Sequence, residues 1–246
     1  MEFFLLLLTD GKFPSNHVSM DEAPLFTRSQ AQDLTLLDSQ TLDYWTRLGI
    51  LQPVAGGGGK GHHRKYDKLQ ITLGRIMKEM AEFGVGGSSL TKMAEEFQAS
   101  IDWFAAKGLT DFAPAASSLI EYWHDLETKG FLEVKVADPV AARNDSRRIE
   151  KDDWAGLVAF HQSVAPLPDD IVLKCKSISF DEMREHFDRF LTLRPEGDGR
   201  STNGDIFLFK NSDGGWEIDF EAEPKQARAF ITIRLREIKR ELWRRL

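Results

Sequence analysis

Residues 37–53, LDSQTLDYWTRLGILQP, hold the clearest structural signal in the chain. Asp38 is a favourable N-cap, and Leu42, Trp45 and Leu48 follow it at helical spacing. The glycine after Leu48 is placed to end this helix, because glycine adopts the left-handed conformation of a C-cap at little cost. The proline at the end of the stretch prevents any continuation. The segment therefore predicts one short amphipathic helix.

A second short helix is predicted just before this one. The segment Thr27 to Gln30 fits the capping-box pattern, and Ala31 and Leu34 then lie on one face. Only a few residues around Leu36 separate the two helices. Two short amphipathic helices with a tight join are the sequence form of a helix-turn-helix.

A glycine-rich basic loop follows the two helices. Five of the six residues 56–61 are glycine, which excludes a helix or a stable strand interior, and their spacing is not that of a nucleotide-binding loop. The residues around and after the glycines that can contact DNA phosphates are Lys60, His62, His63, Arg64 and Lys65. Adjacent histidines rarely chelate one ion, so we expect no metal here. The pattern predicts a hairpin wing.

Two longer helices are predicted after the loop. An apolar stripe at helical spacing begins at Leu69 and ends at Phe83, before Gly84. A further helix begins at Ser88 and ends at Gly108. This helix either joins two copies of the chain or packs inside its own chain, and the sequence favours neither.

The remaining chain alternates helices and strands. Helices are predicted to end near Gly130 and to cover 154–161 and 179–191, with a strand at 132–136 and a hairpin of 205–210 with 216–220. Residues 138–148 are polar without periodicity and predict a linker. The segment 171–176 predicts a strand, and Pro224 is predicted to begin the last helix, with its apolar face formed by Ile231, Leu235, Ile238 and Leu242.

Charge is unevenly distributed along the chain. The net charge is −7, which excludes a protein that coats nucleic acid with its whole surface. The segment Thr27 to Phe83 nevertheless holds eight Lys or Arg and six Asp or Glu, so it carries +2 and the rest carries −9. The residues from Lys225 onward carry +6, which is typical either of a solvated helix face or of a second nucleic-acid contact.

These motifs together resemble the MerR family of bacterial transcription regulators. In residues 37–53 the Thr-Leu, Tyr-aromatic, Arg-Leu-Gly-aliphatic and Pro elements are in the family's register. Residues 26–35 align with the family's first helix, 61–67 are similar to the end of its wing, and 84–90 resemble the start of its fourth helix. The resemblance covers under a third of the chain and implies a winged helix-turn-helix that binds DNA.

The resemblance also implies which residues contact DNA. From the recognition helix, Tyr44 and Arg47 would contact DNA, and Ser39 and Gln40 would reach base edges. Trp45 is expected in the core. From the wing, the residues expected on the DNA backbone are Lys60, His62, His63, Arg64, Lys65 and Tyr66.

Four residues depart from the family's pattern. Asp43 stands where an arginine commonly touches the DNA backbone, and its carboxylate would repel a phosphate in the same place. Leu36 stands where the turn often has glycine. Arg28 stands on the first helix where apolar residues are usual, as does Gln32. We expect these substitutions to loosen the helix packing and to remove one phosphate contact.

The expected fold class is α+β, with a small C-terminal α+β domain that contains a hairpin and a terminal helix. We divide the chain into 1–25, an N-terminal extension; 26–98, the MerR-like domain; 99–150, a helical connector; and 151–246, an effector or partner-binding domain. The apolar run near Met1 is too short for a signal peptide. We hypothesise that translation begins at Met20.

Function is expected to follow from this division. We expect a cytoplasmic, nucleoid-associated regulator that binds a pseudo-palindromic site on double-stranded DNA as a homodimer, while its C-terminal domain senses a small molecule or a protein. The alternative is an architectural or accessory protein, similar to an excision factor, with a protein-interaction module. No residue pattern indicates an enzyme, a cofactor or a membrane segment. The single cysteine, Cys175, excludes an internal disulfide and is expected to be buried.

Overall fold

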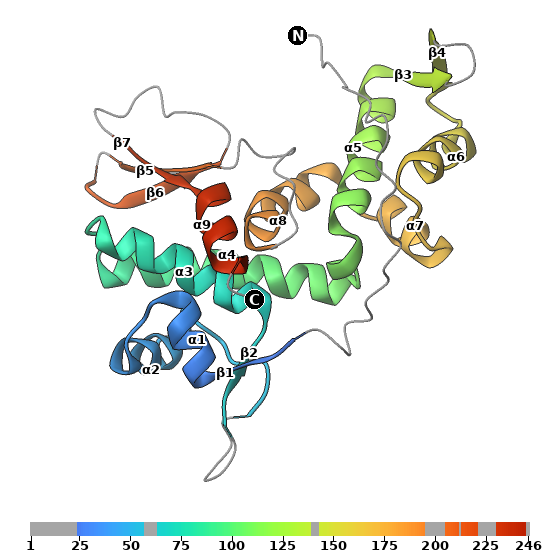
Figure 1. Cartoon of the computed structure of the whole chain (residues 1–246). Helices are drawn as coiled ribbons and strands as arrows, with labels where there is room; N and C mark the ends of the chain where they lie inside the picture. The colour runs from blue at the N-terminus through green and yellow to red at the C-terminus, as the bar shows by residue number, and fades with distance from the viewer. Residues whose placement is uncertain are drawn as a thin grey trace. The chain divides into compact units, whose positions relative to one another are not determined.

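The computed structural model describes residues 24–56, 63–138, 143–194, 205–211, 213–220 and 230–244. They form helices and small antiparallel sheets, which confirms the α+β class (Figure 1). The predictions for the extension before Pro24, for Lys60 and for His62 lie outside these residues.

The chain forms two compact units. The inserted unit consists of Lys107–Arg184, and the terminal unit consists of the described residues before and after it. The described residues before Lys107 and those after Arg184 therefore share one unit. The segment 151–246, which the sequence predicted as one C-terminal domain, is divided between the two units.

The first half of the terminal unit follows the predicted element order. Its elements are β1(Phe26–Thr27), α1(Arg28–Thr35), α2(Ser39–Arg47), β2(Lys65–Tyr66), α3(Lys68–Glu82) and α4(Gly87–Lys107). The starts of the first three helices have a local cause: Thr27 and Gln30 form the predicted capping box, Asp38 caps α2 and Asp67 caps α3. The two short strands pair antiparallel, Phe26 with Tyr66.

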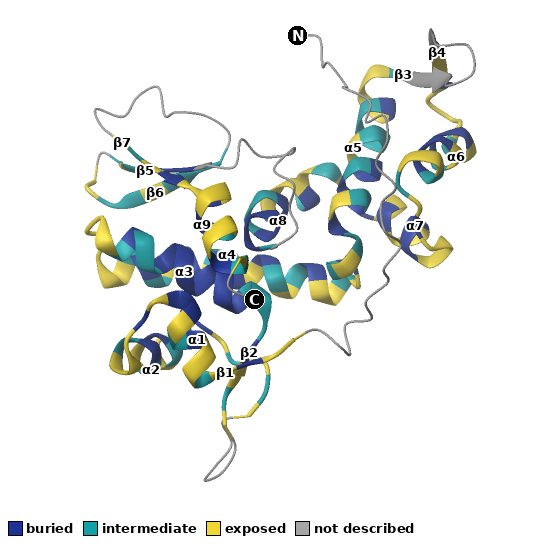
Figure 2. Ribbon diagram, in the orientation of Figure 1, coloured by how far each residue is buried: buried dark blue, intermediate teal, exposed yellow. Residues whose placement is uncertain are grey.

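Helix α3 is the centre of the terminal unit. Its residues Gln70–Met77 are all buried, so α3 is covered on every side (Figure 2). Helix α1 approaches so closely at Gly74 that a Cβ there would lie 2.9 Å from Cγ2 of Thr35. The buried residues of α3 thus extend around the helix, whereas a surface helix buries a stripe on one side only.

Two buried glutamines join α3, α4 and the loop after α2. Nε2 of Gln70 donates to Oε1 of Gln98 over 2.8 Å, and Nε2 of Gln98 donates back to Oε1 of Gln70 over 2.9 Å. Gln98 also donates to the carbonyl of Ile50, while Oε1 of Gln70 accepts from the backbone N–H of Gln52. Every polar atom of this amide pair has a partner, as burial requires.

The C-terminal elements of the terminal unit pack on the same core. They are α8(Phe180–Leu193), which belongs to this unit from Glu185 onward, β5(Asp205–Lys210), β6(Trp216–Asp219), β7(Phe230–Arg234) and α9(Leu235–Trp243). The sheet has the order β6-β5-β7, all antiparallel, and its β5–β6 pair confirms the predicted hairpin. The buried residues that join the core around α3 are Leu193, Ile206, Leu208, Ile233, Leu235, Ile238 and Leu242.

The prediction of one helix from Pro224 onward is wrong for the described part of that segment. Ile231 belongs to strand β7, where it pairs with Leu208 of β5, and the helix begins only at Leu235. The alternation in Phe-Ile-Thr-Ile-Arg is a strand pattern, and β-branched residues favour it. Residues 224–229 lie outside the described residues.

The inserted unit contains a hairpin and three helices. Its elements after the short 3₁₀ turn η2(Thr110–Phe112) are α5(Ala113–Lys129), β3(Phe131–Asp138), β4(Arg143–Glu150), α6(Trp154–Val164) and α7(Asp169–Lys176). The predicted strand at 132–136 is confirmed within β3. Trp123 and Trp154 meet edge to face, and the Lys176 ammonium lies 5.0 Å from the Trp154 ring centroid.

Two predictions for the inserted unit are wrong. The segment 171–176 is not a strand but helix α7, because Asp169 and Asp170 in its first turn and Lys174 and Lys176 in its last turn complement the helix dipole. The polar segment 138–148 is not a linker, since β4 pairs with β3 along its length. That pairing supplies the backbone hydrogen bonds which the side-chain pattern did not indicate.

Leu36, between α1 and α2, has a left-handed backbone with φ of 58°. We expect Leu36→Gly to raise the free energy of unfolding by up to about 1 kcal/mol, because it relieves the clash of Cβ with the backbone. Leu36→Val should lower it by about 1 kcal/mol or more. Leu48→Gly is the matched control, since Leu48 is a half-exposed C-cap with an ordinary φ of −79°. Urea unfolding measures all three, and a Leu36→Gly protein as destabilised as Leu48→Gly would contradict the prediction.

Gln98→Leu should destabilise the terminal unit by about 2–4 kcal/mol, because the Gln70 amide and the Ile50 carbonyl each lose a buried partner. Gln32→Leu is the control, since that side chain on α1 has no hydrogen bond in the described structure and should change stability by less than about 0.5 kcal/mol. Thermal and urea unfolding of both variants test this, and equal effects would show that the amide pair contributes nothing.

Candidate nucleic-acid interface

Helix α2 presents a polar face to solvent. Leu42 and Trp45 are buried, 0% and 5% exposed, and fix its inner face on the core, as expected for Trp45. The opposite face exposes Gln40, Tyr44 and Arg47, and half of the Tyr44 side chain is accessible. The structure therefore places these three predicted DNA contacts together on one accessible surface.

The N-terminus of α2 is already occupied by a carboxylate. Oδ1 of Asp38 accepts from the backbone N–H groups of Gln40 and Thr41 over 2.8 and 2.9 Å, and Oδ2 accepts from Oγ1 of Thr41. These hydrogen bonds, that from the Thr41 hydroxyl above all, lower the pKa of Asp38. A phosphate at this helix end would meet a negative charge, so an anion must bind elsewhere on the face.

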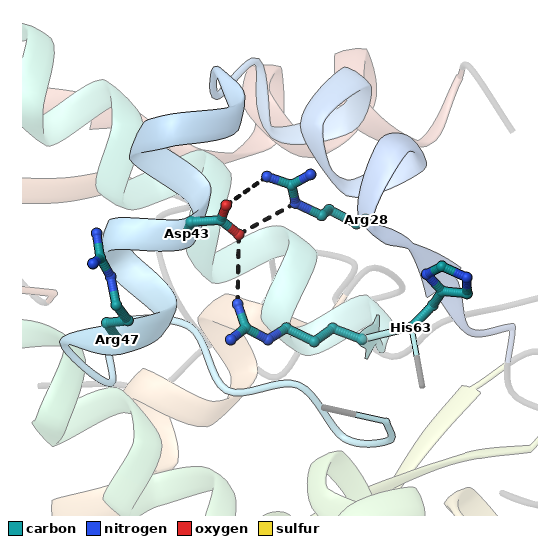
Figure 3. A pocket seen from close by; sticks show the side chains of 5 residues that line it. Arg28, Asp43, Arg47 and His63 are labelled. Atoms are coloured by element: carbon teal, nitrogen blue, oxygen red, sulfur yellow. Dashed lines mark hydrogen bonds and ion pairs between the residues drawn. The ribbon is translucent and has the colours of Figure 1, made fainter. Parts of the chain in front are cut away.

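Asp43 is held by two arginines from other elements. Its Oδ2 lies 2.5 Å from Nη2 of Arg28 and its Oδ1 lies 3.2 Å from Nε, so α1 is joined to α2 by a two-point ion pair (Figure 3). Nη1 of Arg64, just before β2, reaches Oδ1 over 3.4 Å. Nη2 of Arg28 also donates to the carbonyl and the hydroxyl of Ser39. We call these four residues the Asp43 cluster.

The cluster changes the interpretation of two sequence predictions. The departures Arg28 and Asp43 compensate each other, and the ion pair joins the two helices rather than loosening them. The Ser39 hydroxyl, predicted to reach a base, accepts from Arg28 instead. Sequence analysis named both departures but did not pair them. The ion pair could have been predicted from the sequence, because residues of opposite charge replace the usual family residues on two helices that pack together.

One open hollow lies beside this cluster. It is lined by Arg28, Asp43, Arg47, His63 and Arg64, three arginines against one carboxylate, so its formal charge is +2 with His63 neutral (Figure 3). Neither Arg47 nor His63 has an ion-pair partner among the described residues. The hollow can therefore accept an anion from solvent, such as a backbone phosphate.

The base of the predicted wing is anchored in the core. Residue Lys65 pairs across to Ala55 and to Thr27, and its side chain is exposed. Tyr66 is only 1% exposed, and its hydroxyl lies 3.0 Å from Oγ1 of Thr46 on α2. The prediction of Tyr66 as a DNA contact is therefore corrected: a fully packed ring holds the wing against α2 and offers no surface.

Three other kinds of site can be checked in the described residues: a metal centre, a reactive cysteine and a membrane-spanning helix. No group of three His, Cys, Asp or Glu side chains gathers there to hold a metal. Cys175 is buried as expected, 1% exposed, and burial raises the pKa of its thiol to about 12, which disfavours the reactive thiolate. Within the same residues, no helix is both long enough and apolar enough to cross a membrane.

Comparison of the chain with protein-family models and with curated proteins finds no match. The resemblance to MerR regulators therefore stays a prediction from the residues quoted above. The surface formed by α1, α2 and the base of the wing is the candidate site on which a function can be argued.

Proposed function

We propose that the chain is a DNA-binding transcription regulator of the MerR type, in which α2 enters the major groove and the wing contacts the flanking backbone. The observation that carries the proposal is the gathering of Arg47, His63 and Arg64 beside the exposed face of α2. With Arg28 of α1, three short segments of the chain supply one positive surface there. The shape and charge of that surface suit a polyanion with a groove.

The residues of this surface divide into two roles. Gln40 and Arg47 have the side chains that read adenine and guanine edges by paired hydrogen bonds, and Tyr44 adds an exposed aromatic surface. Arg64, Lys65 and His63 come from the wing, where contacts to phosphates set affinity and register without reading sequence.

The two compact units suggest how a signal could be separated from DNA binding. In this proposal the terminal unit binds a pseudo-palindromic site as a homodimer, and the inserted unit, Lys107–Arg184, senses a small molecule or a protein partner. The inserted unit has its own helices and hairpin, so it is the part of the chain best suited to an independent ligand. The proposed location is the cytoplasm, on the nucleoid.

Arg64→Ala should weaken binding to every duplex and reduce the slope of log K against log salt by about 1, because one phosphate contact is lost. Arg47→Ala should cost about 1–3 kcal/mol on the specific site and less on scrambled DNA. Lys92→Ala, an exposed lysine of α4 without an ion-pair partner in the described structure, removes the same charge and should change neither.

The measurement is fluorescence anisotropy across a salt series, with a duplex from upstream of the protein's own coding region and a scrambled duplex. A regulator binds the first more tightly, with a steep salt slope. Weak and equal binding to both would instead support the architectural alternative. No binding to either duplex at low salt would contradict both functions.

A further inference from the structure

A carboxylate lies where the proposed interface needs positive charge. Asp43 lines the same hollow as Arg47, His63 and Arg64, and it is the only acidic side chain among the residues that line it. An acidic residue in the middle of a phosphate-binding surface weakens phosphate binding, so its presence there indicates a separate role. The geometry of its two arginines indicates such a role.

The two arginines are held very differently. The Arg28 guanidinium meets both carboxylate oxygens with Nε and Nη2, and it also donates to the Ser39 carbonyl over 3.3 Å. Two nitrogens of this head group, Nε and Nη2, thus have partners in the described structure. Arg64 makes a single contact of 3.4 Å to Oδ1. The two side chains are similarly exposed, 42% for Arg28 and 35% for Arg64, so the difference lies in the number and length of their contacts. An exposed single contact of that length is weak and easily exchanged.

We infer that Asp43 is an internal counter-anion which docks the wing arginine, Arg64, on the recognition helix in the free protein, and that a DNA phosphate takes Arg64 from it on binding. The inference rests on the proposed function. Arg28 stays on Asp43 in both states and keeps α1 against α2. Asp43 is thus a positioning residue that sets the level of sequence-independent affinity.

The exchange has a direct electrostatic consequence. In the free protein the Asp43 carboxylate neutralises the charge of one arginine. The residues that line the hollow therefore carry a formal charge of +2 rather than +3 when the protein approaches DNA. Loss of Asp43 must therefore strengthen binding to any duplex and steepen its salt dependence.

The test uses the full chain and the scrambled duplex as probe. Asp43→Asn should bind it about two- to fivefold more tightly and steepen the slope of log K against log salt by about 1. In an Arg64→Gln background the gain should fall below about twofold, because the partner is already absent. Asp102→Asn, which removes an exposed carboxylate of α4, controls for net charge and should change binding by less than about twofold.

Two results would overturn the inference: weaker binding by an Asp43→Asn protein with an unchanged melting temperature, or an equal gain with and without Arg64. A measurement on the unaltered protein covers the case in which Asp43→Asn does not fold. NMR of the arginine Nε–Hε groups should show that DNA changes the Arg64 signal and leaves that of Arg28 in place. A change at Arg28 without one at Arg64 would also overturn it.

Failure of the proposed function gives a different result. If the unaltered protein binds no duplex, the function and the phosphate exchange both fail. If it binds DNA but Asp43→Asn has no effect, only the role of Asp43 fails.

Discussion

The burial of α3 on every side is the constraint on which the terminal unit depends. Eight consecutive residues, Gln70–Met77, are buried, so a single partner helix cannot cover all of their side chains. Helix α1 approaches at Gly74, Gln98 of α4 pairs with Gln70, and α9 covers a further side. Even the charged residue on this stretch, Arg75, is paired, with Glu79 and with Glu241 of α9. The C-terminal helix therefore completes the core that holds the candidate DNA-binding helices.

This construction changes how the chain can be divided by function. Trp243 at the end of α9 packs against Phe26 of β1, their ring centroids 6.2 Å apart, and Lys68 lies over the same indole. The last helix thus supports the strand pair from which the wing extends. A change in α9 would therefore act on β1 and its pairing with β2, whereas the inserted unit forms its own compact body.

The surface chemistry depends on a balance between attraction and selectivity. Three arginines make the hollow attractive to phosphate, and one carboxylate limits that attraction. Under the proposed function, too much sequence-independent affinity would spread the protein over the genome, so a built-in counter-charge would suit the search for few sites. The same carboxylate joins α1 to α2 through Arg28, which gives it a structural role besides its electrostatic one.

The sequence by itself determined the features that depend on neighbours within about four residues. Capping residues Thr27, Asp38 and Asp67 placed the starts of α1, α2 and α3, and glycines at 49, 84, 108 and 130 marked the ends of α2 to α5, because helix starts and stops are local hydrogen-bond problems. The resemblance to the MerR family, rather than periodicity, singled out Tyr44 and Arg47, and both are exposed on α2. Only the tertiary structure decided the rest. The strand state of β4 and β7 required a distant partner strand, the burial of Tyr66 required Thr46, and the charge of the hollow required Asp43 to meet arginines 15 and 21 residues away.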